Sequence, residues 1–538
     1  MVACRLFLSS LLASAVRATP VPYEALRIPH VDPHELLCQL PIVKKFLCPR
    51  TGDNALNIAT PLGAARGTSD PSGATRFTVK YATANRWAPS TLASAWGLPT
   101  GSLNETTLPL ACPQPGVDPS AYTEDCLSMV LYVPPGLTVM SNAPVLMWIH
   151  GGSFVVGSAS GPGLDGSNLA VATNSIVAVV QYRLGALGFM SPDGTQPRSF
   201  GGTPAKITLA GQSSGANMIR ALLAVPSAAS LFNSAILHSD PMNFGFLAPA
   251  TQQTLQGKFN SLINCTATDM SCRNSLSLNA ILDAQQILYN TAASLDPSTG
   301  NFEPIRPVRD GSFITSPLDS TAPFPPVNKP IMVTSVLNDS GFAIYQQFPD
   351  PLPESWFVPV CQQTFGPTRT DTIVDSPHYT PEPALDGAVD SRAQLQLVGT
   401  DYMWKCAGWT FARNWVGHGG SAFVGEFQVG ATYPGNEAVP FCTQSGVVCH
   451  QDDIQIVFGT VQNPTPTQAS LVAEMQKRYK AFIANGNPNA DGLANWAPAT
   501  TSDVHALKLG GSGEVAVGAC DPNFWGQGVQ YDYQVYGI

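Results

Sequence analysis

The stretch that decides the fold is Ile207-Thr208-Leu209-Ala210-Gly211-Gln212-Ser213-Ser214-Gly215. Its first four residues form an apolar run typical of a strand buried on both faces, and a helical pattern begins at Ala216. Between them lies the spacing Gly-x-Ser-x-Gly. At a strand-to-helix junction this spacing is typical of a nucleophile elbow, where glycines permit a sharp turn and the serine stands at the positive end of the helix. The stretch therefore predicts Ser213 as a nucleophile on an α/β scaffold.

The rest of the chain repeats the alternation of strand and helix. Apolar runs predict strands, and amphipathic patterns predict helices, the last of which has Thr467 as a candidate cap. The strands are expected at Val145–Ile149, Ile176–Gln181, Ile207–Ala210, Ala235–Leu237, Ile331–Val336 and Ala422–Phe427, and the helices at Ala216–Val225, Ala280–Tyr289 and Ser470–Ala484. This order predicts an α/β fold with a mostly parallel sheet. No linker divides the chain, although 345–385 and 430–450 are rich in loop-forming residues, so we expect one domain over 19–538.

Composition narrows the class of protein. The 538 residues are 44% hydrophobic and 12% charged, which suits a large core and excludes a disordered chain. A formal net charge of −10 disfavours a nucleic-acid partner, because phosphate binding needs a basic surface.

The first residues resemble a secretory signal. Arg5 precedes an apolar stretch over Leu6–Ala15, and small residues follow at positions suited to signal peptidase. We therefore expect a signal peptide over 1–18, an extracellular mature protein and no membrane span, since no other apolar run approaches the roughly 20 residues required.

Cysteines and sequons agree with export. Of 12 cysteines, Cys4 lies in the signal, and an oxidising compartment would allow the close pairs to form disulfides. These pairs are Cys38 with Cys48, Cys112 with Cys126, Cys265 with Cys272 and Cys442 with Cys449, while the pairing of Cys361, Cys406 and Cys520 is open. Asn104, Asn264 and Asn338 are predicted glycosylation sites.

A second motif follows the strand at Val145–Ile149. His150-Gly151-Gly152 can aim backbone N–H groups at one point without side chains in the way. Together with the N–H of Ser214, Gly151 and Gly152 would form an oxyanion hole. The alternative is an ordinary glycine turn.

An acid and a base should follow the serine in chain order. Asp339 is the carboxylate at the end of the strand Ile331–Val336, and a turn aspartate is the alternative interpretation. The later histidines are His378, His418, His450 and His505. Residue chemistry favours His450, whose loop a Cys442–Cys449 bridge could hold, but leaves a structural histidine as an equal alternative.

The motifs together resemble the type-B carboxylesterase/lipase family of α/β-hydrolases, and secreted fungal members above all. The resemblance spans about Thr60 to Trp496. It rests on the elbow and on the segments Glu124–Leu127, Trp148–Gly152, Phe200–Gly202, Pro307–Gly311, Phe458–Gly459 and Asn485–Asn489. It implies Ser213 as nucleophile, His450 as base, Gly151, Gly152 and Ser214 as oxyanion hole, and bridges Cys112–Cys126 and Cys265–Cys272.

The chain departs from the family at three places. The usual acid is glutamate. Asn338-Asp339-Ser340-Gly341 fits an Asn-Glu-Ala-Gly variant with Asp339 as acid, whereas the other alignment would put Ser340 there. The connection over 189–205 is too short for the usual crossover helix, so we expect sheet beside the nucleophile strand to be uncovered. The loop between Cys112 and Cys126 is short, which favours an open esterase site over a lidded lipase.

The sequence thus predicts a secreted serine hydrolase that cleaves small-molecule or lipid esters through an acyl-enzyme, without metal or organic cofactor. Three alternatives stay open: a catalytically impaired binding protein on the same fold, a non-functional splice or gene form, and a lipase acting at lipid interfaces.

Overall fold

The structure is a computed structural model that describes residues 56–102, 104–137, 141–190, 206–319, 324–325, 327–381 and 389–538. All of these residues belong to one compact unit. The predicted signal peptide and all but the first two residues of the 189–205 connection lie outside the described residues. Cys38 and Cys48 lie outside them as well, so the bridge expected between these two cysteines stays a prediction.

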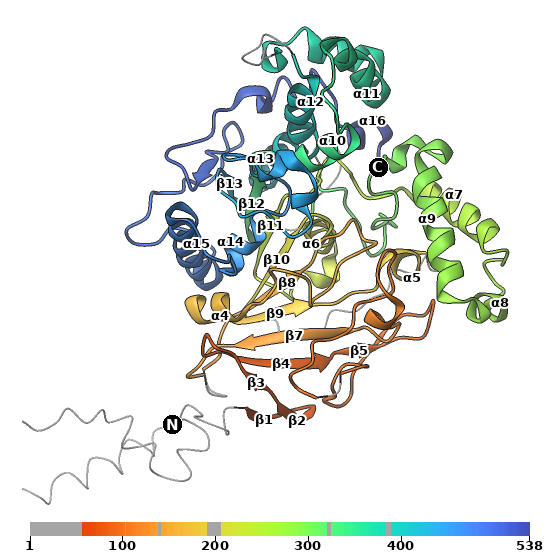
Figure 1. Ribbon diagram of the computed structural model, residues 1–538, viewed down its shortest axis with the longest axis vertical. Coiled ribbons are helices and arrows are strands. Elements are labelled where there is room, and N and C mark those ends of the chain that lie inside the picture. The colour runs from red at the N-terminus through yellow and green to blue at the C-terminus, as the bar shows by residue number, and fades with distance from the viewer. Residues whose placement is uncertain are drawn as a thin grey trace, which may run out of the picture. The chain divides into compact units, whose positions relative to one another are not determined.

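A ten-stranded sheet organises this unit (Figure 1). The strands occur in the order β14-β13-β12-β11-β10-β8-β9-β7-β4-β3, parallel from β14 to β9 and antiparallel beyond. Their bounds are β3 Thr68–Ser69, β4 Thr75–Lys80, β7 Ser128–Val133, β8 Val145–Ile149, β9 Ile176–Val180, β10 Ile207–Gln212, β11 Ser234–His238, β12 Pro330–Val336, β13 Ser421–Phe427 and β14 Leu507–Leu509. Two small hairpins pair β1 (Asn57–Thr60) with β2 (Gly63–Arg66) and β5 (Ala82–Thr83) with β6 (Thr91–Leu92).

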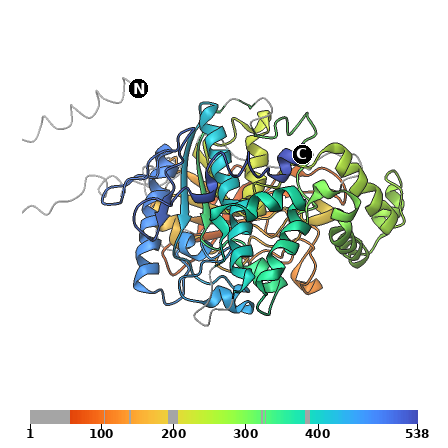
Figure 2. The ribbon, with the colours of Figure 1, turned by 90° about the horizontal axis from the view of Figure 1, so that it is seen from above.

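Helices cover both faces of the sheet (Figures 1 and 2). One core joins strand residues such as Leu209 and Val333 to α6, α7, α9 and α11–α13, and the other joins Trp148 and Met332 to α4, α14 and α15. The helix bounds are α4 Ser167–Thr173, α5 Gly185–Phe189, α6 Ser214–Leu223, α7 Pro249–Leu262, α8 Met270–Ser275, α9 Leu278–Leu295, α10 Gly341–Gln347, α11 Phe357–Val374, α12 Ser391–Thr400, α13 Cys406–Gly417, α14 Ile454–Phe458, α15 Pro466–Asn485 and α16 Asp532–Tyr536.

The predicted α/β fold is confirmed, and each predicted strand overlaps an observed one. The helix predicted at Ser470–Ala484 begins earlier, because Thr465 and not Thr467 is its cap. Thr465 and Gln468 form a capping box around Pro466 at the first helical position. The 345–385 segment contains α11, which the loop-rich composition concealed because Gly366 and Pro367 interrupt its pattern.

The sheet beside the nucleophile strand is not laid bare as expected. All six residues of β10 are buried. In the neighbouring strand β8, Val145 and Met147 are the described residues that are only half-buried. Both lie on the face that α6 covers.

No helix in the described part of the chain combines the length and apolar character that crossing a membrane requires.

Candidate active site

Ser213 lies in the sharp turn between β10 and α6. Its backbone has φ 57° and ψ −131°, in a region that residues other than glycine rarely adopt. The turn needs the flanking glycine as well, since a Cβ on Gly215 would lie 2.1 Å from the carbonyl oxygen of Ile149. The Ser213 N–H donates to the His238 carbonyl of β11 at 2.9 Å, which fixes the elbow against the next strand. The hydroxyl is thereby held at the carboxyl edge of the sheet.

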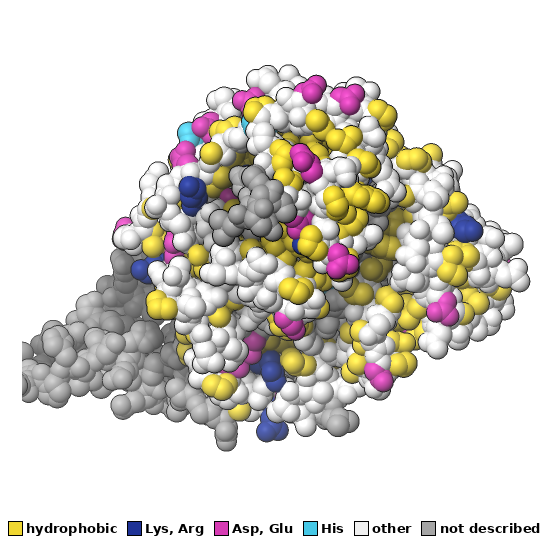
Figure 3. All heavy atoms as spheres, turned by 45° about the horizontal axis from the view of Figure 1, so that its top comes forward, with side chains coloured by type: hydrophobic (Ala, Val, Ile, Leu, Met, Phe, Trp, Pro, Cys, Tyr) yellow, Lys and Arg dark blue, Asp and Glu magenta, His cyan; other side chains and the backbone are white. Residues whose placement is uncertain are grey.

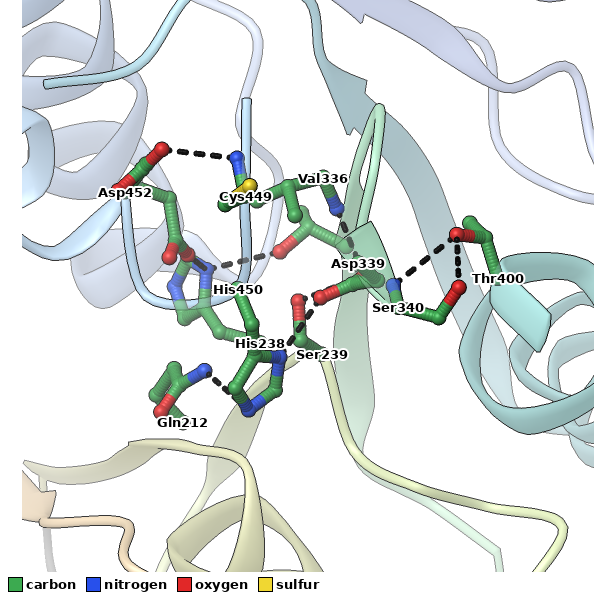
Figure 4. Close-up of polar contacts among 12 residues, drawn as sticks. Gln212, His238, Ser239, Val336, Asp339, Ser340, Thr400, Cys449, His450 and Asp452 are labelled. Carbon is green, nitrogen blue, oxygen red and sulfur yellow. Dashed lines mark hydrogen bonds and ion pairs between the residues drawn. The ribbon is translucent and has the colours of Figure 1, made fainter. Parts of the chain in front are cut away.

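His450 faces Asp339, which comes from the loop after β12 (Figure 4). The distance from His450 Nδ1 to Asp339 Oδ1 is 2.7 Å, although the two residues are 111 positions apart in sequence. Asp339 is 1% exposed. The fold therefore brings together two of the predicted site residues, which follow the neighbouring strands β12 and β13.

Three donors hold the Asp339 carboxylate. Besides His450, the Ser239 hydroxyl donates to Oδ2 at 3.0 Å and the Val336 N–H donates to the same atom at 2.9 Å. Burial raises the pKa of Asp339, while the His450 and Val336 hydrogen bonds act in the opposite direction. Ser340 turns elsewhere, because its hydroxyl donates to the Gln396 carbonyl at 2.6 Å. Of the two candidate acids, Asp339 is therefore the one that contacts His450, whereas Ser340 contacts α12.

The loop that carries His450 is fixed from two sides. Cys449 is bridged to Cys442, and its N–H donates to Asp452 Oδ2 at 2.8 Å. Asn436 donates to the carbonyl of His450 and to Asp452 Oδ1, both at 2.8 Å. The imidazole therefore sits on a rigid turn, as orientation of a general base requires.

The second nitrogen of the imidazole contacts an unexpected partner. Gln212 Nε2 lies 3.1 Å from His450 Nε2. An amide nitrogen only donates, so His450 Nε2 accepts and the ring proton resides on Nδ1, facing Asp339. This is the tautomer that a base needs. Among the described residues, Ser213 Oγ makes no hydrogen bond to His450, and the amide of Gln212 occupies that place.

The turn after β8 is built for backbone donors. Gly152 has φ 117°, and a Cβ there would lie 2.2 Å from the Val156 carbonyl oxygen. His150 holds the turn: its Nδ1 bonds the Gly151 carbonyl at 2.8 Å and its ring stacks on Tyr182. Burial lowers the pKa of His150 to about 4, so it is neutral. A Cβ on Gly151 would lie 3.0 Å from Ser213 Cβ, so this turn adjoins the serine.

Ser214 supplies the third predicted donor of the oxyanion hole. It is the first residue of α6, where backbone N–H groups have no partner within the helix. The three predicted donors, Gly151, Gly152 and Ser214, thus belong to two segments that meet at Ser213.

A cavity of about 270 Å³ opens onto this site. Its wall is mainly apolar, with Phe244, Val398 and Trp404 among the lining side chains. The ring centroid of Trp404 lies 5.2 Å from that of His450. Hydrophobic side chains are prominent around the hollow in Figure 3. The cavity suits the apolar part of a small organic substrate.

One polar residue of this wall, Glu303, was not foreseen from the sequence. It is 3% exposed and lines the cavity together with Ser213 and His450. No motif signals it. The only cue is a carboxylate just ahead of the segment Pro307–Gly311, in a chain poor in charge.

The other three candidate bases, His378, His418 and His505, lie outside the site of Ser213. His418 bonds the Asn414 carbonyl at 2.7 Å and stacks on Phe324, and His505 approaches Asp503 and Glu514. His378 packs against Phe524. None of the three lines the cavity.

Four disulfides occur in the described residues: Cys112–Cys126, Cys265–Cys272, Cys406–Cys520 and Cys442–Cys449. Sequence could not assign the third, whose partners are 114 positions apart. The fourth close pair of the sequence, Cys38 with Cys48, is not among them because both residues precede the described part of the chain. Cys361 is buried and unpaired. Asp401 lies close to the sulfurs of Cys406 and Cys520, but a disulfide offers no thiolate to a metal ion.

The sequons differ in their surroundings. Asn104 and Asn264 are exposed. Asn338 is half-buried, donates from Nδ2 to Gln396 at 3.0 Å and accepts from the Val448 N–H at 3.1 Å. A glycan on Nδ2 would replace one of its two hydrogens beside Gln396, whereas Asn104 and Asn264 project from the surface. Glycosylation at all three asparagines stays a prediction.

The short loop between Cys112 and Cys126 forms hydrogen bonds with the segment after β8 that contains Gly151 and Gly152. Gln114 accepts from the Gly157 N–H and donates to the Gly157 carbonyl, both at 2.9 Å. These two hydrogen bonds and the disulfide fix the position of the loop beside the site. A lid that opens on a hinge would not be fixed in this way.

Comparison with known proteins agrees with this architecture. The profile described as the Carboxylesterase family matches residues 54–197 and 196–525, and the two matches meet within the shortened connection. "Crystal protein" of Dictyostelium discoideum is 27% identical over 419 residues, which cover 72% of this chain and 74% of that protein. "Carboxylesterase 1E" of Rattus norvegicus is 25% identical over 420 residues, covering 70% and 72%.

Among solved structures, a PNB esterase shares the fold with a TM-score of 0.67, at 21% identity and covering 84% of this chain and 95% of that one. With the family profile matching most of its length, the chain belongs to the carboxylesterase family.

Proposed function

We propose that this protein is a serine esterase that hydrolyses carboxylic esters through Ser213, His450 and Asp339. The observation that carries the proposal is the 2.7 Å contact between His450 Nδ1 and Asp339 Oδ1 beside the strained elbow of Ser213. Membership of the carboxylesterase family supports the reaction class.

In the proposed reaction, Ser213 Oγ attacks the ester carbonyl and its proton passes to His450 Nε2. Asp339 holds the ring and stabilises the imidazolium that forms. The backbone N–H groups of Gly151, Gly152 and Ser214 receive the negative oxygen of the tetrahedral intermediate. His450 then protonates the leaving alkoxide, and an acyl-serine remains. Water, activated by the same imidazole, releases the acid and restores the serine.

For this cycle Gln212 must release His450 Nε2. Its amide lies 3.1 Å from the nitrogen that has to accept the serine proton. A substrate that enters the site would shift the imidazole toward Ser213, since catalytic hydrogen bonds are often long in free enzymes and tighten on binding.

An open esterase site is favoured over a lipase that needs an interface to uncover it. The short Cys112–Cys126 loop is anchored on Gly157, and the cavity of about 270 Å³ suits small esters. We also propose that the mature chain is secreted and carries glycans at Asn104 and Asn264.

Labelling by a fluorophosphonate probe tests the proposal, with Ser213→Ala as the control. We expect covalent labelling of the purified protein that is absent in the variant. A series of 4-nitrophenyl esters of rising chain length, assayed below and above micelle formation, separates esterase from lipase. A folded protein that neither labels nor hydrolyses any ester would overturn the proposal in favour of a binding protein.

A further inference from the structure

Glu303 is the one carboxyl group besides Asp339 in the described wall of the cavity. It lies at 3% exposure, and its Oε2 has no hydrogen-bond partner among the described residues. A buried carboxyl oxygen without a partner costs free energy, so such a group in a substrate cavity needs a reason.

The loop around Glu303 is built to hold it there. Arg306 is 1% exposed, and its guanidinium donates to four backbone carbonyls, among them those of Gly245 at 2.7 Å and of Glu303 itself at 2.8 Å. The guanidinium also lies over the ring of Phe244, 5.3 Å from its centroid. Four of the five N–H donors of Arg306 thus bind main-chain carbonyls, and the described residues contain no ion pair between its guanidinium and the Glu303 carboxylate.

The other charged and polar side chains near Glu303 have hydrogen-bond or ion-pair partners of their own. Arg220 pairs with Asp240, with Nε and Oδ2 2.9 Å apart. Tyr289 of α9 donates to the carbonyl of Phe302, and its hydroxyl also approaches Ser153. Ser153, next to the oxyanion turn, is the side chain that reaches the Glu303 carboxyl.

These surroundings keep Glu303 protonated near neutral pH. Burial and the charge of Asp240 raise its pKa to about 8, while Arg306, Arg220 and Ser153 act in the opposite direction. A neutral carboxyl group carries one O–H donor. Ser153 reaches the Glu303 carboxyl, but Oε2 has no hydrogen-bond partner among the described residues. With the proton on Oε2, the O–H donor faces a mostly apolar wall and stays unsatisfied until a ligand brings an acceptor.

We propose that Glu303 selects esters that carry an ether, carbonyl or hydroxyl oxygen on the arm lying in this cavity, by donating a hydrogen bond to that oxygen. The inference rests on the proposed esterase function and names the substrate class of the same site. An all-carbon arm would leave the carboxyl unsatisfied, which is how a polar group in an apolar pocket discriminates.

The test uses pairs of esters that differ by one atom. In each pair an ether oxygen replaces one CH2, as in 4-nitrophenyl methoxyacetate against butanoate, 3-methoxypropanoate against pentanoate, and 2-methoxyethyl against butyl acetate. The readout is the ratio of kcat/KM within a pair. Comparing this ratio between variants cancels the intrinsic reactivity of each ester and any effect of pH on the chemical step that the two esters share.

We expect Glu303→Leu to lower the ratio about tenfold for at least one pair, a size typical of one lost hydrogen bond. Glu303→Gln keeps a donor and a similar shape, so its ratio should stay near that of the native protein. The native ratio should fall as pH rises through about 8, whereas the Glu303→Gln ratio should not change with pH. Glu514→Gln, at an exposed glutamate beside β14, is the matched control.

A second readout does not depend on turnover. In the Ser213→Ala background, quenching of tryptophan fluorescence reports binding of the intact esters, since Trp404 lines the cavity. One outcome is that the Ser213→Ala protein binds the ether esters more tightly than the all-carbon esters, that Glu303→Leu abolishes this preference, and that the native protein hydrolyses no ester. This outcome would support the inference and overturn the proposed function. Hydrolysis with ratios that neither Glu303 variant changes would do the reverse.

Discussion

Asp339 is the residue that we propose as the acid, where the family resemblance leads us to expect a glutamate. The loop after β12 brings its Oδ1 within 2.7 Å of His450 Nδ1. We expect Asp339→Asn to lower kcat on 4-nitrophenyl butanoate by about four orders of magnitude, because the amide would favour the wrong tautomer of the histidine.

Ser340→Ala is the natural control for that change, because Ser340 is adjacent and equally buried but bonds the Gln396 carbonyl. It should retain kcat within a few-fold. A collapse of kcat in Ser340→Ala, with activity surviving in Asp339→Asn, would favour the other alignment of the acid.

Gln212 invites a prediction of the opposite sign. Its amide donates a hydrogen bond to His450 Nε2, the atom that has to accept the Ser213 proton in the proposed reaction. We expect Gln212→Leu to raise the second-order rate of fluorophosphonate labelling about two- to tenfold, the size of one neutral hydrogen bond. The labelling rate is the measurement, with urea denaturation to show unchanged stability. Slower labelling would instead mean that Gln212 holds the ring in its working orientation.

At the scale of elements, two disulfides form a matched pair. Cys442–Cys449 and Cys265–Cys272 each span seven positions, so chain entropy assigns both the same stabilisation, about 2.5 kcal/mol. The first bridge closes the turn before His450, whereas the second joins the loop after α7 to α8. Replacing both cysteines of a pair by serine should lower the unfolding free energy by a similar amount in either case.

Only the loss of Cys442–Cys449 should also lower kcat, by about tenfold, because the base then rests on Asp452 and Asn436 alone. Equal kcat values for the two variants would show that the bridge has no part in orienting His450. Denaturant titration and steady-state kinetics on the same preparations separate the two effects.

For the whole molecule, Glu303 ties stability to pH. Its pKa is about 4.5 when solvated and about 8 in the folded state, so the folded state holds the proton more tightly. Its contribution to stability is therefore full below pH 4.5 and declines as pH rises toward 8. Relative to the native protein, Glu303→Gln should gain up to about 1.4 kcal/mol of unfolding free energy per pH unit across that window.

Urea titrations at several pH values from 5 to 8 measure this difference. The buried Asp452, whose pKa burial raises to about 7, affects both proteins alike and cancels. A difference in unfolding free energy that is constant with pH would show that Glu303 is ionised throughout.

Much of this architecture is readable from local sequence. Strand β8 was predicted to the residue, because a buried parallel strand is an uninterrupted apolar run, and Ser213 stood out because its turn admits few residues. Long-range pairing was not readable: the Cys406–Cys520 bridge and the contact of Gln212 with His450 depend on the packing of distant segments. Glu303 was missed because its effect comes from the apolar wall around it, and no residue next to it in sequence reveals that wall.

The wide spacing of the site along the chain has a consequence for biosynthesis. Gln212, next to Ser213, and His450 are separated by 238 positions, and His450 follows β13, which pairs with β12 and β14. A ribosome adds about 5–20 residues per second, so the elbow leaves the ribosome ten seconds or more before its base. During that interval the nascent chain lacks the proposed base, so we do not expect it to hydrolyse esters. The activity proposed for this protein therefore cannot begin before the segment that carries His450 has left the ribosome.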